Sequence, residues 1–356
     1  MHFSDGSIPD EYRRYIGWKS ALLFVVTGAL SVSLLVAVSL GAAHIPLADV
    51  ARSLAGAAVS KRFEMILWNI RLPQALAAIV AGAGLAVAGT AMQSILRNPL
   101  GSPFTLGISH AAAFGAAFSV MILDGGIMAS THTDAVTITS PYVTTGLAFV
   151  FSLAAAGVII GVSRLRGATP EVMILTGVAL GSLFTAGTML LQFFADDVQL
   201  AAMIFWTFGD TARASWSELG IVSVVTVVAC AYFLFNGWNY NAIDAGDETA
   251  KGLGVRVERV RMVGMLLATL LTAVIIAFLG IIGFVGLVVP HMARRVIGSD
   301  HRFLLPATIL GGGLLLLVSD TVARLILAPH VLPVSVLTAF LGAPVFIYLI
   351  LRGQRG

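Results

Sequence analysis

The sequence predicts an all-α, polytopic membrane protein. Of its 356 residues, 58% are hydrophobic and only 11% are charged, whereas soluble globular domains carry about 25% charged residues. Uncharged apolar stretches follow one another along the chain, separated by short charged clusters, and each is long enough to cross a membrane as a helix. The longest connections are about twenty residues each. We therefore expect a single transmembrane domain, residues 1–356, and no soluble enzyme domain.

The first predicted helix covers residues 19–43 and is not cleaved as a signal peptide. It follows a segment that contains Asp5, Asp10 and Glu11, and its uncharged run is too long for the core of a signal peptide. Five further uncharged stretches predict the helices near residues 72–96, 104–123, 139–163, 171–195 and 218–238.

The next uncharged stretch, residues 262–293, is too long for one membrane crossing. Its 32 residues would extend about 48 Å as a helix, against a hydrocarbon core of roughly 30 Å. Because Gly280 and two further glycines interrupt it, we expect a break near Gly280 that separates the helices 258–279 and 281–297. The helices 303–325 and 333–352 complete a set of ten.

The distribution of basic residues tests this arrangement, since cytoplasmic loops collect Lys and Arg. With ten helices and a cytoplasmic N-terminus, 15 of the 21 Lys and Arg fall on the cytoplasmic side and 6 fall outside. If residues 262–293 were one helix, the counts would become 11 and 10. The charges therefore favour ten helices with both termini cytoplasmic. They also explain the basic residues as membrane-flanking groups and not as a nucleic-acid-binding surface.

Polar and irregular positions around the helix 72–96 are the first candidates for function. Gly82, Gly84 and Gly89 form a small-residue surface that permits close helix packing. The amide of Gln93, one turn further on, either hydrogen-bonds to another helix or lines a pathway. Residues 97–103 contain two prolines and a glycine, which prevent a continuous helix. Such backbone near a membrane requires protein or a water-filled cavity beside it.

Residues 244–258 form the most amphiphilic cytoplasmic connection. Asp247 and Glu248 precede an Ala-Lys turn that ends at Gly252 and Gly254. This pattern is typical of a short helix with an acidic first turn and a glycine stop. The segment is either a solvated connector or a surface element that docks a partner protein.

The remaining titratable groups indicate no catalytic or metal site. Cys230 is the single cysteine, and His291 has no second ligand at suitable spacing, so a structural role is favoured for it. Asp320 and Arg324 are spaced for an intrahelical ion pair. In the alternative interpretation, Arg324 extends outward and meets an acidic partner. None of the three lysines lies in a P-loop. If ATP drives this protein, another chain hydrolyses it.

From about residue 70 to residue 352, the chain resembles the FecCD permease family of bacterial ABC importers for iron complexes and cobalamin. The resemblance rests on ordered motifs, which are Arg71-Leu72-Pro73, Gly89 to Gln93, Arg97-Asn98-Pro99-Leu100, Leu253-Gly254, Gly283-Phe284-Val285-Gly286-Leu287 through Pro290-His291, Asp300-His301-Arg302 and Leu341-Gly342-Ala343-Pro344. The family fold has ten helices, in agreement with the count reached from the charges.

The resemblance implies a homodimer in the bacterial inner membrane, with the transport pathway between its two copies. Two ATP-binding-cassette ATPase subunits would bind on the cytoplasmic side and use ATP and Mg²⁺, a substrate-binding protein would dock outside, and this chain would bind no cofactor. The coupling segment of the family falls on residues 244–258. The residues implied in coupling to the ATPase are Asp244, Asp247, Glu248, Lys251, Gly252, Leu253 and Gly254.

Further residues are implied in the gate, the pathway and the docking of the binding protein. Asn98 and Leu100 match positions near the cytoplasmic gate, and Arg71 and Arg324 match basic docking positions. The other candidate pathway residues are Met92, Gln93, Gln192 and Trp206, although a Met or an aromatic residue at such positions is more often simple packing. One departure concerns Gln74, where the cobalamin importer has a second docking Arg. Either docking is weaker here, or Arg52, Lys61 or Arg62 compensates.

We therefore expect the permease subunit of an ATP-driven importer that moves a ferric siderophore or haem by alternating access. Cobalamin import is the alternative within the family, and relatives also handle oxyanions such as molybdate. A secondary transporter driven by an ion gradient is the alternative from another class, motivated by Asp320, Gln93 and the glycine-broken helix pair. The candidate lining residues do not discriminate between the chelates.

Overall fold

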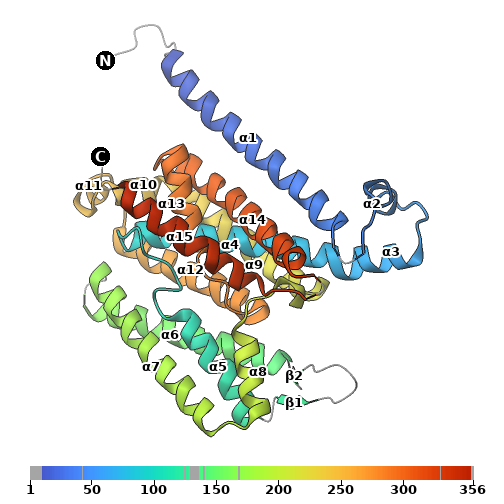
Figure 1. The fold of residues 1–356 in the computed structure, drawn as a ribbon. Coiled ribbons are helices and arrows are strands. Elements are labelled where there is room, and N and C mark those ends of the chain that lie inside the picture. The colour runs from blue at the N-terminus through green and yellow to red at the C-terminus, as the bar shows by residue number, and fades with distance from the viewer. Residues whose placement is uncertain are drawn as a thin grey trace.

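The computed structural model describes residues 10–41, 43–123, 126–128, 136–138, 141–166, 169–328 and 330–353, and it is almost entirely helical (Figure 1). Its helices are α1 (Asp10–Ser39), α2 (Leu47–Leu54), α3 (Lys61–Ile66), the π-helix η1 (Leu67–Arg71), α4 (Leu72–Ile95), α5 (Ile108–Ile122), α6 (Pro141–Leu165), α7 (Pro170–Phe194), α8 (Asp197–Thr207), the 3-10 helix η2 (Thr211–Arg213), α9 (Trp216–Phe235), α10 (Gly237–Asp244), α11 (Asp247–Gly252), α12 (Val257–Leu279), α13 (Val285–Ile297), α14 (His301–Ile326) and α15 (Val334–Gly353). An antiparallel pair of short strands, β1 (Gly126–Met128) and β2 (Val136–Ile138), connects α5 to α6.

Each of the ten ranges predicted from the sequence overlaps a helix, and the range 218–238 covers most of α9 and the first two residues of α10. Within the described residues, seven helices are long and apolar enough to cross a membrane, and α5 and residues Val334–Tyr348 of α15 are shorter apolar helices. The polytopic helical class is therefore confirmed, while the count of ten crossings and the orientation of the termini stay predictions. The start of the predicted helix 139–163 falls on residues outside the described ranges.

The long uncharged stretch is broken where its glycines predict. α12 ends at Leu279 and α13 begins at Val285, with Gly280 at φ +77° and Phe284 at φ +65°. The backbone between them is paired with protein, because Ile281 forms a parallel bridge with Phe208 and the Asp210 amide donates to the Leu279 carbonyl at 2.8 Å. This pairing is what non-helical backbone at membrane depth requires.

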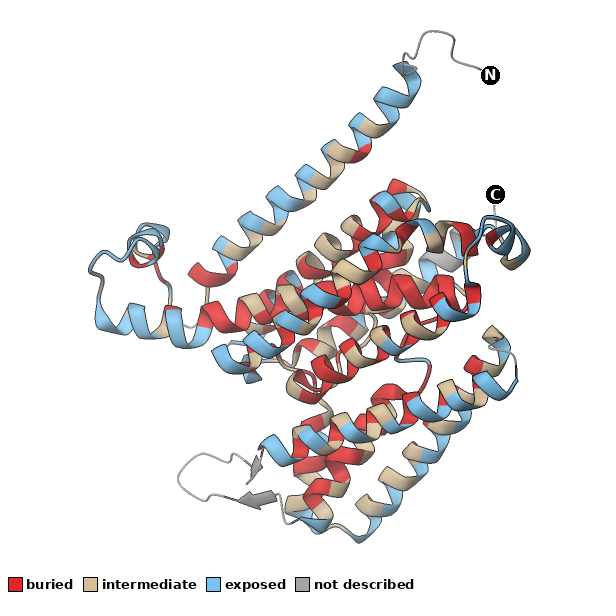
Figure 2. Ribbon diagram, turned by 180° about the vertical axis from the view of Figure 1, so that it is seen from behind, coloured by how far each residue is buried: buried red, intermediate tan, exposed pale blue. Residues whose placement is uncertain are grey.

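Helix α4 is the centre of the fold, and 83% of the most apolar window in its span is buried. It packs against α9, α12, α13 and α14, and Figure 2 shows it as a buried rod through the molecule. Glycines set these contacts, because a Cβ atom at Gly82 would lie 2.2 Å from the Gly312 carbonyl oxygen, and one at Gly89 would lie 1.8 Å from that of Gly286. The predicted small-residue packing surface is confirmed.

Helices α5 to α8 form a second layer beside this core (Figure 1). Phe114 of α5 contacts Phe151 of α6 and Phe184 of α7, with ring centroids 5.0 and 5.6 Å apart. Only 11% of the apolar window of α7 is buried, and α1 has the same share. Most of the surface of α1 and α7 therefore faces outward, toward lipid or another chain.

Candidate coupling segment and gate

The predicted coupling segment folds as two short helices, α10 and α11, joined by Ala245 and Gly246. Gly246 has φ +116°, a conformation that a side chain would strain. Asp247 and Glu248 lie in the first turn of α11 and Lys251 in its last, where their charges complement the helix dipole. The short helix predicted from the sequence is confirmed at Asp247–Gly252.

An ion pair fastens α11 to the core. Both guanidinium nitrogens of Arg261 donate to the Asp247 carboxylate at 2.8 Å, and the Arg261 Nε donates to the Ile95 carbonyl at the end of α4, 3.2 Å away. The Arg261 side chain is only 4% exposed. Arg97 approaches the same carboxylate at 3.8 Å. Because bidentate Arg–carboxylate pairs fix orientation as well as distance, α11 is held in one position on α4 and α12.

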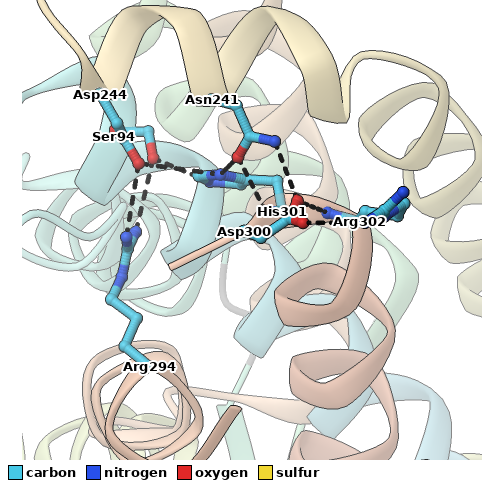
Figure 3. A network of polar contacts seen from close by, with 7 residues as sticks. All are labelled: Ser94, Asn241, Asp244, Arg294, Asp300, His301 and Arg302. Atoms are coloured by element: carbon cyan, nitrogen blue, oxygen red, sulfur yellow. Dashed lines mark hydrogen bonds and ion pairs between the residues drawn. The ribbon is translucent and has the colours of Figure 1, made fainter. Parts of the chain in front are cut away.

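A second set of polar contacts fastens α10 to α14, as Figure 3 shows. The Asn241 Oδ1 accepts from the backbone amide of His301 at 2.8 Å and lies 2.9 Å from its Nδ1. The Asn241 Nδ2 donates to Asp300 at 3.0 Å. Asp300 in turn caps α14 by accepting from the Arg302 amide at 3.0 Å. The Asn241 side chain of α10 thus binds Asp300 and His301 directly, and Asp300 connects it to Arg302.

The same network reaches α4 and α13. The His301 Nε2 lies 3.0 Å from the Ser94 hydroxyl, to which Arg294 of α13 donates at 3.4 Å. Arg294 also pairs with Asp244 at the end of α10, 3.5 Å away. His301 is fully buried, so its ring is a fixed part of the packing. The contacts in Figure 3 therefore join α4, α10, α13 and α14 at one end of the molecule.

These contacts divide the predicted coupling residues into two groups. The carboxylates of Asp244 and Asp247 bind Arg294 and Arg261 of the same chain. Glu248, Lys251 and Leu253 are exposed, with exposed fractions of 90% and 57% for the first two side chains and 70% for Leu253. Glu248 accepts from Lys251 at 2.9 Å, and this contact raises the pKa of the lysine amine. Contact with an ATPase stays a prediction. Glu248, Lys251 and Leu253, together with the exposed Gly252 and Gly254, form the surface that is available for this contact.

The predicted gate residues lie beside this segment, at the C-terminal end of α4. Met92 and Gln93 are buried, and neither polar atom of the Gln93 amide has a hydrogen-bond partner among the described residues. Arg97 adopts φ +46°, so the chain turns sharply after α4. The Asn98 Oδ1 accepts from the Leu100 amide at 2.8 Å, and Leu100 is 45% exposed. The turn predicted from the prolines is present, and its role as a gate stays a prediction.

Gln192 and Trp206 lie elsewhere and do not join these gate residues. The first residue of α7, Pro170, lines the same cavity as Asp247, so Gln192 in the last turn of α7 lies toward the opposite end. Trp206 is in α8, a helix that the sequence did not predict, and it borders a cavity of about 430 Å³. The place of Gln192 and Trp206 in a transport pathway stays a prediction.

The predicted docking arginines are engaged inside the protein. Arg71 is 4% exposed and donates to the carbonyls of Val38 and Ser39 at 2.7 Å and to that of Ala43, which caps the C-terminal end of α1. Arg324 pairs with Asp320 at 3.1 Å, as the four-residue spacing predicts. Docking by these two arginines stays a prediction, and it requires that they leave these partners.

Gln74 is part of the same buried cluster. Its amide donates to Asp320 Oδ1 at 3.1 Å, and the Thr211 hydroxyl donates to the same oxygen. Gln74 is 4% exposed, and its effect on the docking of a binding protein stays a prediction. Asp320, which motivated the ion-gradient alternative, is occupied by Arg324, Gln74 and Thr211.

Sequence reasoning missed Arg261, Asn241 and Arg294 as functional residues. Arg261 and Arg294 were counted only as membrane-flanking charges, because their partners lie 14 and 50 residues away. Asn241 stands at the end of an apolar stretch, and no local pattern marks it. Among the described residues, no three His, Cys, Asp or Glu side chains gather as a metal site.

Comparison with known proteins places this geometry in context. The model of the FecCD transport family matches residues 29–352. A protein of Methanocaldococcus jannaschii assigned as an ABC transporter permease is 51% identical over 345 residues, which cover 97% of this chain and 98% of that protein. The hemin transport system permease protein of Yersinia pestis is 38% identical over 323 residues, 90% and 94% of the two chains. A solved structure described as an inward-facing metal-chelate type ABC transporter superposes with a TM-score of 0.81 at 28% identity, over 94% of this chain and 99% of that one.

Proposed function

Because the chain belongs to the FecCD transport family and is a permease component of an ABC importer, we propose that it moves an iron complex, a ferric siderophore or haem, across the inner membrane by alternating access. Two copies would enclose the pathway, two separate ATPase subunits would hydrolyse ATP with Mg²⁺, and a binding protein would deliver the substrate. Each state of such a cycle needs its own contacts with these partners.

The anchored α11 is the observation that carries the proposed mechanism. Its exposed residues Glu248, Lys251 and Leu253 offer a surface to the ATPase, while Asp247 ties the same helix to α4 and α12 through Arg261. A displacement of α11 is therefore passed to the helices that carry the gate residues. Asn241 and Asp244 pass the same displacement to α14 and α13.

An iron complex is the substrate that the relatives favour. Relatives are named for the import of hemin, Fe(3+)-citrate, vitamin B12 and molybdate. The hemin permease is 38% identical over 90% of this chain, against 35% over 82% for the vitamin B12 permease. Cobalamin is therefore the second candidate.

Two surfaces suit the remaining partners. The exposed face of α7 is available for a second copy of the chain. The segment of α2 and α3 projects from the end opposite α11 (Figure 1) and exposes Arg52, Lys61 and Arg62. Arg52 makes only an exposed pair with Asp49 at 3.8 Å, so these side chains would meet acidic residues of a binding protein without leaving buried partners, as Arg71 and Arg324 would have to do.

Uptake into proteoliposomes tests the proposal. The vesicles would carry this chain with its ATPase, with the binding protein outside, and would receive labelled ferric siderophore, haem or cobalamin with and without internal ATP. We expect ATP-dependent uptake of a siderophore or of haem. ATP-dependent uptake of cobalamin alone would replace the substrate, and ATP-independent uptake that an ionophore abolishes would refute the mechanism.

A further inference from the structure

An apolar groove runs between α1, α13 and α14 on the outer surface of the helix bundle. It encloses about 350 Å³, a volume within the range of small-molecule sites. All the residues that line it are apolar, and they are Leu22, Val26, Val289, Met292, Ala293, Val296, Ile297, Ala307, Gly311, Leu314, Leu315 and Val318. Met292, Val296 and Val318 are between 41% and 51% exposed, so the groove is open to its surroundings, which in this part of the protein are lipid.

A buried lysine stands at one end of this groove. Lys19 lies on α1 one turn before Leu22, hence on the same helix face, and it is only 3% exposed. Its Nζ contacts the Tyr15 hydroxyl and lies 4.0 Å from the centre of the Tyr15 ring and 5.0 Å from that of Phe303 on α14. An ammonium group can donate three hydrogen bonds. Among the described residues, the bond to the Tyr15 hydroxyl is the one hydrogen bond that Lys19 Nζ donates.

No carboxylate neutralises Lys19 at ion-pair distance within the described part of the chain. Asp300 lies near enough for the lysine charge to lower its pKa, but its Oδ1 accepts from Asn241 and from the Arg302 amide, and its Oδ2 pairs with the Arg302 guanidinium at 3.4 Å. The Arg302 guanidinium lies 4.9 Å from the same Phe303 ring and is 41% exposed. Lys19 and Arg302 therefore flank Phe303 with one carboxylate, Asp300, beside them. The cluster keeps a net positive charge, and the predicted topology places this end of the groove at the cytoplasmic leaflet.

We propose that this groove binds an anionic phospholipid, with an acyl chain along α13 and α14 and the phosphate between Lys19 and Arg302. The apolar walls match the chain and the two cations match the headgroup. A helix from a second copy would fill the walls but would bring no anion to the net positive charge at this end of the groove. The site is independent of the transported substrate.

Native mass spectrometry of the permease–ATPase complex tests this proposal, with phosphatidylglycerol and phosphatidylcholine of matched chains as probes. We expect phosphatidylglycerol to bind in preference to phosphatidylcholine. Lys19→Gln should weaken phosphatidylglycerol binding about fivefold, the effect of one lysine near an anionic headgroup, and Lys19→Arg should restore it. Arg164→Gln is the matched control, because it removes an exposed charge from the C-terminal end of α6, away from the groove.

A second variant tests the groove itself. A Cβ atom at Gly311 would lie 3.3 Å from the Val289 Cγ1, so Gly311→Leu places a side chain in the groove with a small local shift. It should lower the binding of both lipids. Equal binding of phosphatidylglycerol by the wild type and Lys19→Gln, or equal binding of the two lipids, would overturn the proposal. So would displacement of the lipid by inorganic phosphate alone, or a disulfide between two copies that carry Val26→Cys.

Discussion

The anchoring role of Asp247 can be separated from partner contact by one substitution. Asp247→Asn keeps the shape of the side chain but removes the charge that holds both guanidinium nitrogens of Arg261 at 2.8 Å. A hydrogen bond to a charged group contributes about 1.5–3 kcal/mol to stability. Because the Asp247 side chain is 30% exposed, we assign about 2 kcal/mol to its interaction with Arg261. This energy corresponds to a change of about thirtyfold in the ratio of anchored to released α11.

The assay measures ATP hydrolysis, substrate uptake and ATPase binding in the same proteoliposomes. We expect Asp247→Asn to bind the ATPase normally and to hydrolyse ATP, but to move several-fold less substrate for each ATP. Leu253→Asp, which alters the exposed surface, should instead weaken ATPase binding. A double-mutant cycle with Arg261→Gln should return a coupling energy near 2 kcal/mol. If Asp247→Asn lost ATPase binding as strongly as Leu253→Asp did, Asp247 would be a partner contact and the anchoring argument would be wrong.

Three further predictions concern packing, docking and pH. Gly89→Ala should lower the thermal stability of the purified protein, since the new Cβ would lie 1.8 Å from a carbonyl oxygen of α13, whereas Gly220→Ala, with nothing within 4 Å, should not. Arg62→Glu should weaken capture of the binding protein in a pull-down, more at low salt than at high salt; equal loss at both would argue against an electrostatic contact. Burial opposes ionisation of Asp300, but hydrogen bonds led by the one from Asn241 outweigh it and lower the carboxyl pKa below 3.8. Its contribution to stability is therefore present above the unfolded-state pKa and is lost as the pH falls through the lower folded-state value. Asp300→Asn should lack this acid-dependent loss in a melting series that extends below pH 4.

The sequence predicted the helices well because their signal is local. Charge-free runs and the glycines near Gly280 are visible within one stretch of chain, and hydrocarbon thickness converts their length into a number of crossings. Helix α8 was missed because its 11 residues are too few to cross a membrane, although its capping pair, Asp196 and Gln199, marks its start.

The side-chain network could not be predicted because its partners are distant in sequence. Arg261 and Asp247 are 14 residues apart and Gln74 and Asp320 are 246 apart, so no helical or strand spacing relates them. Arg71 was expected at the surface, since long basic side chains near helix ends reach for water. The carbonyls of Ser39, at the end of α1, and of Ala43 provide the alternative partners, and only the folded structure brings them within reach of Arg71.

The two polar networks lie at opposite ends of α4, and this placement constrains how they communicate. At one end Ser94 and the Ile95 carbonyl meet His301 and Arg261, and at the other Gln74 meets Asp320. Between these two ends, glycines of α4 pack directly against the backbones of α13 and α14. Close-packed interiors have low compressibility, so they transmit displacement. We therefore expect a shift of α11 to reach the Asp320 end as a tilt of α4 together with α14, which contributes His301 to one network and Asp320 to the other.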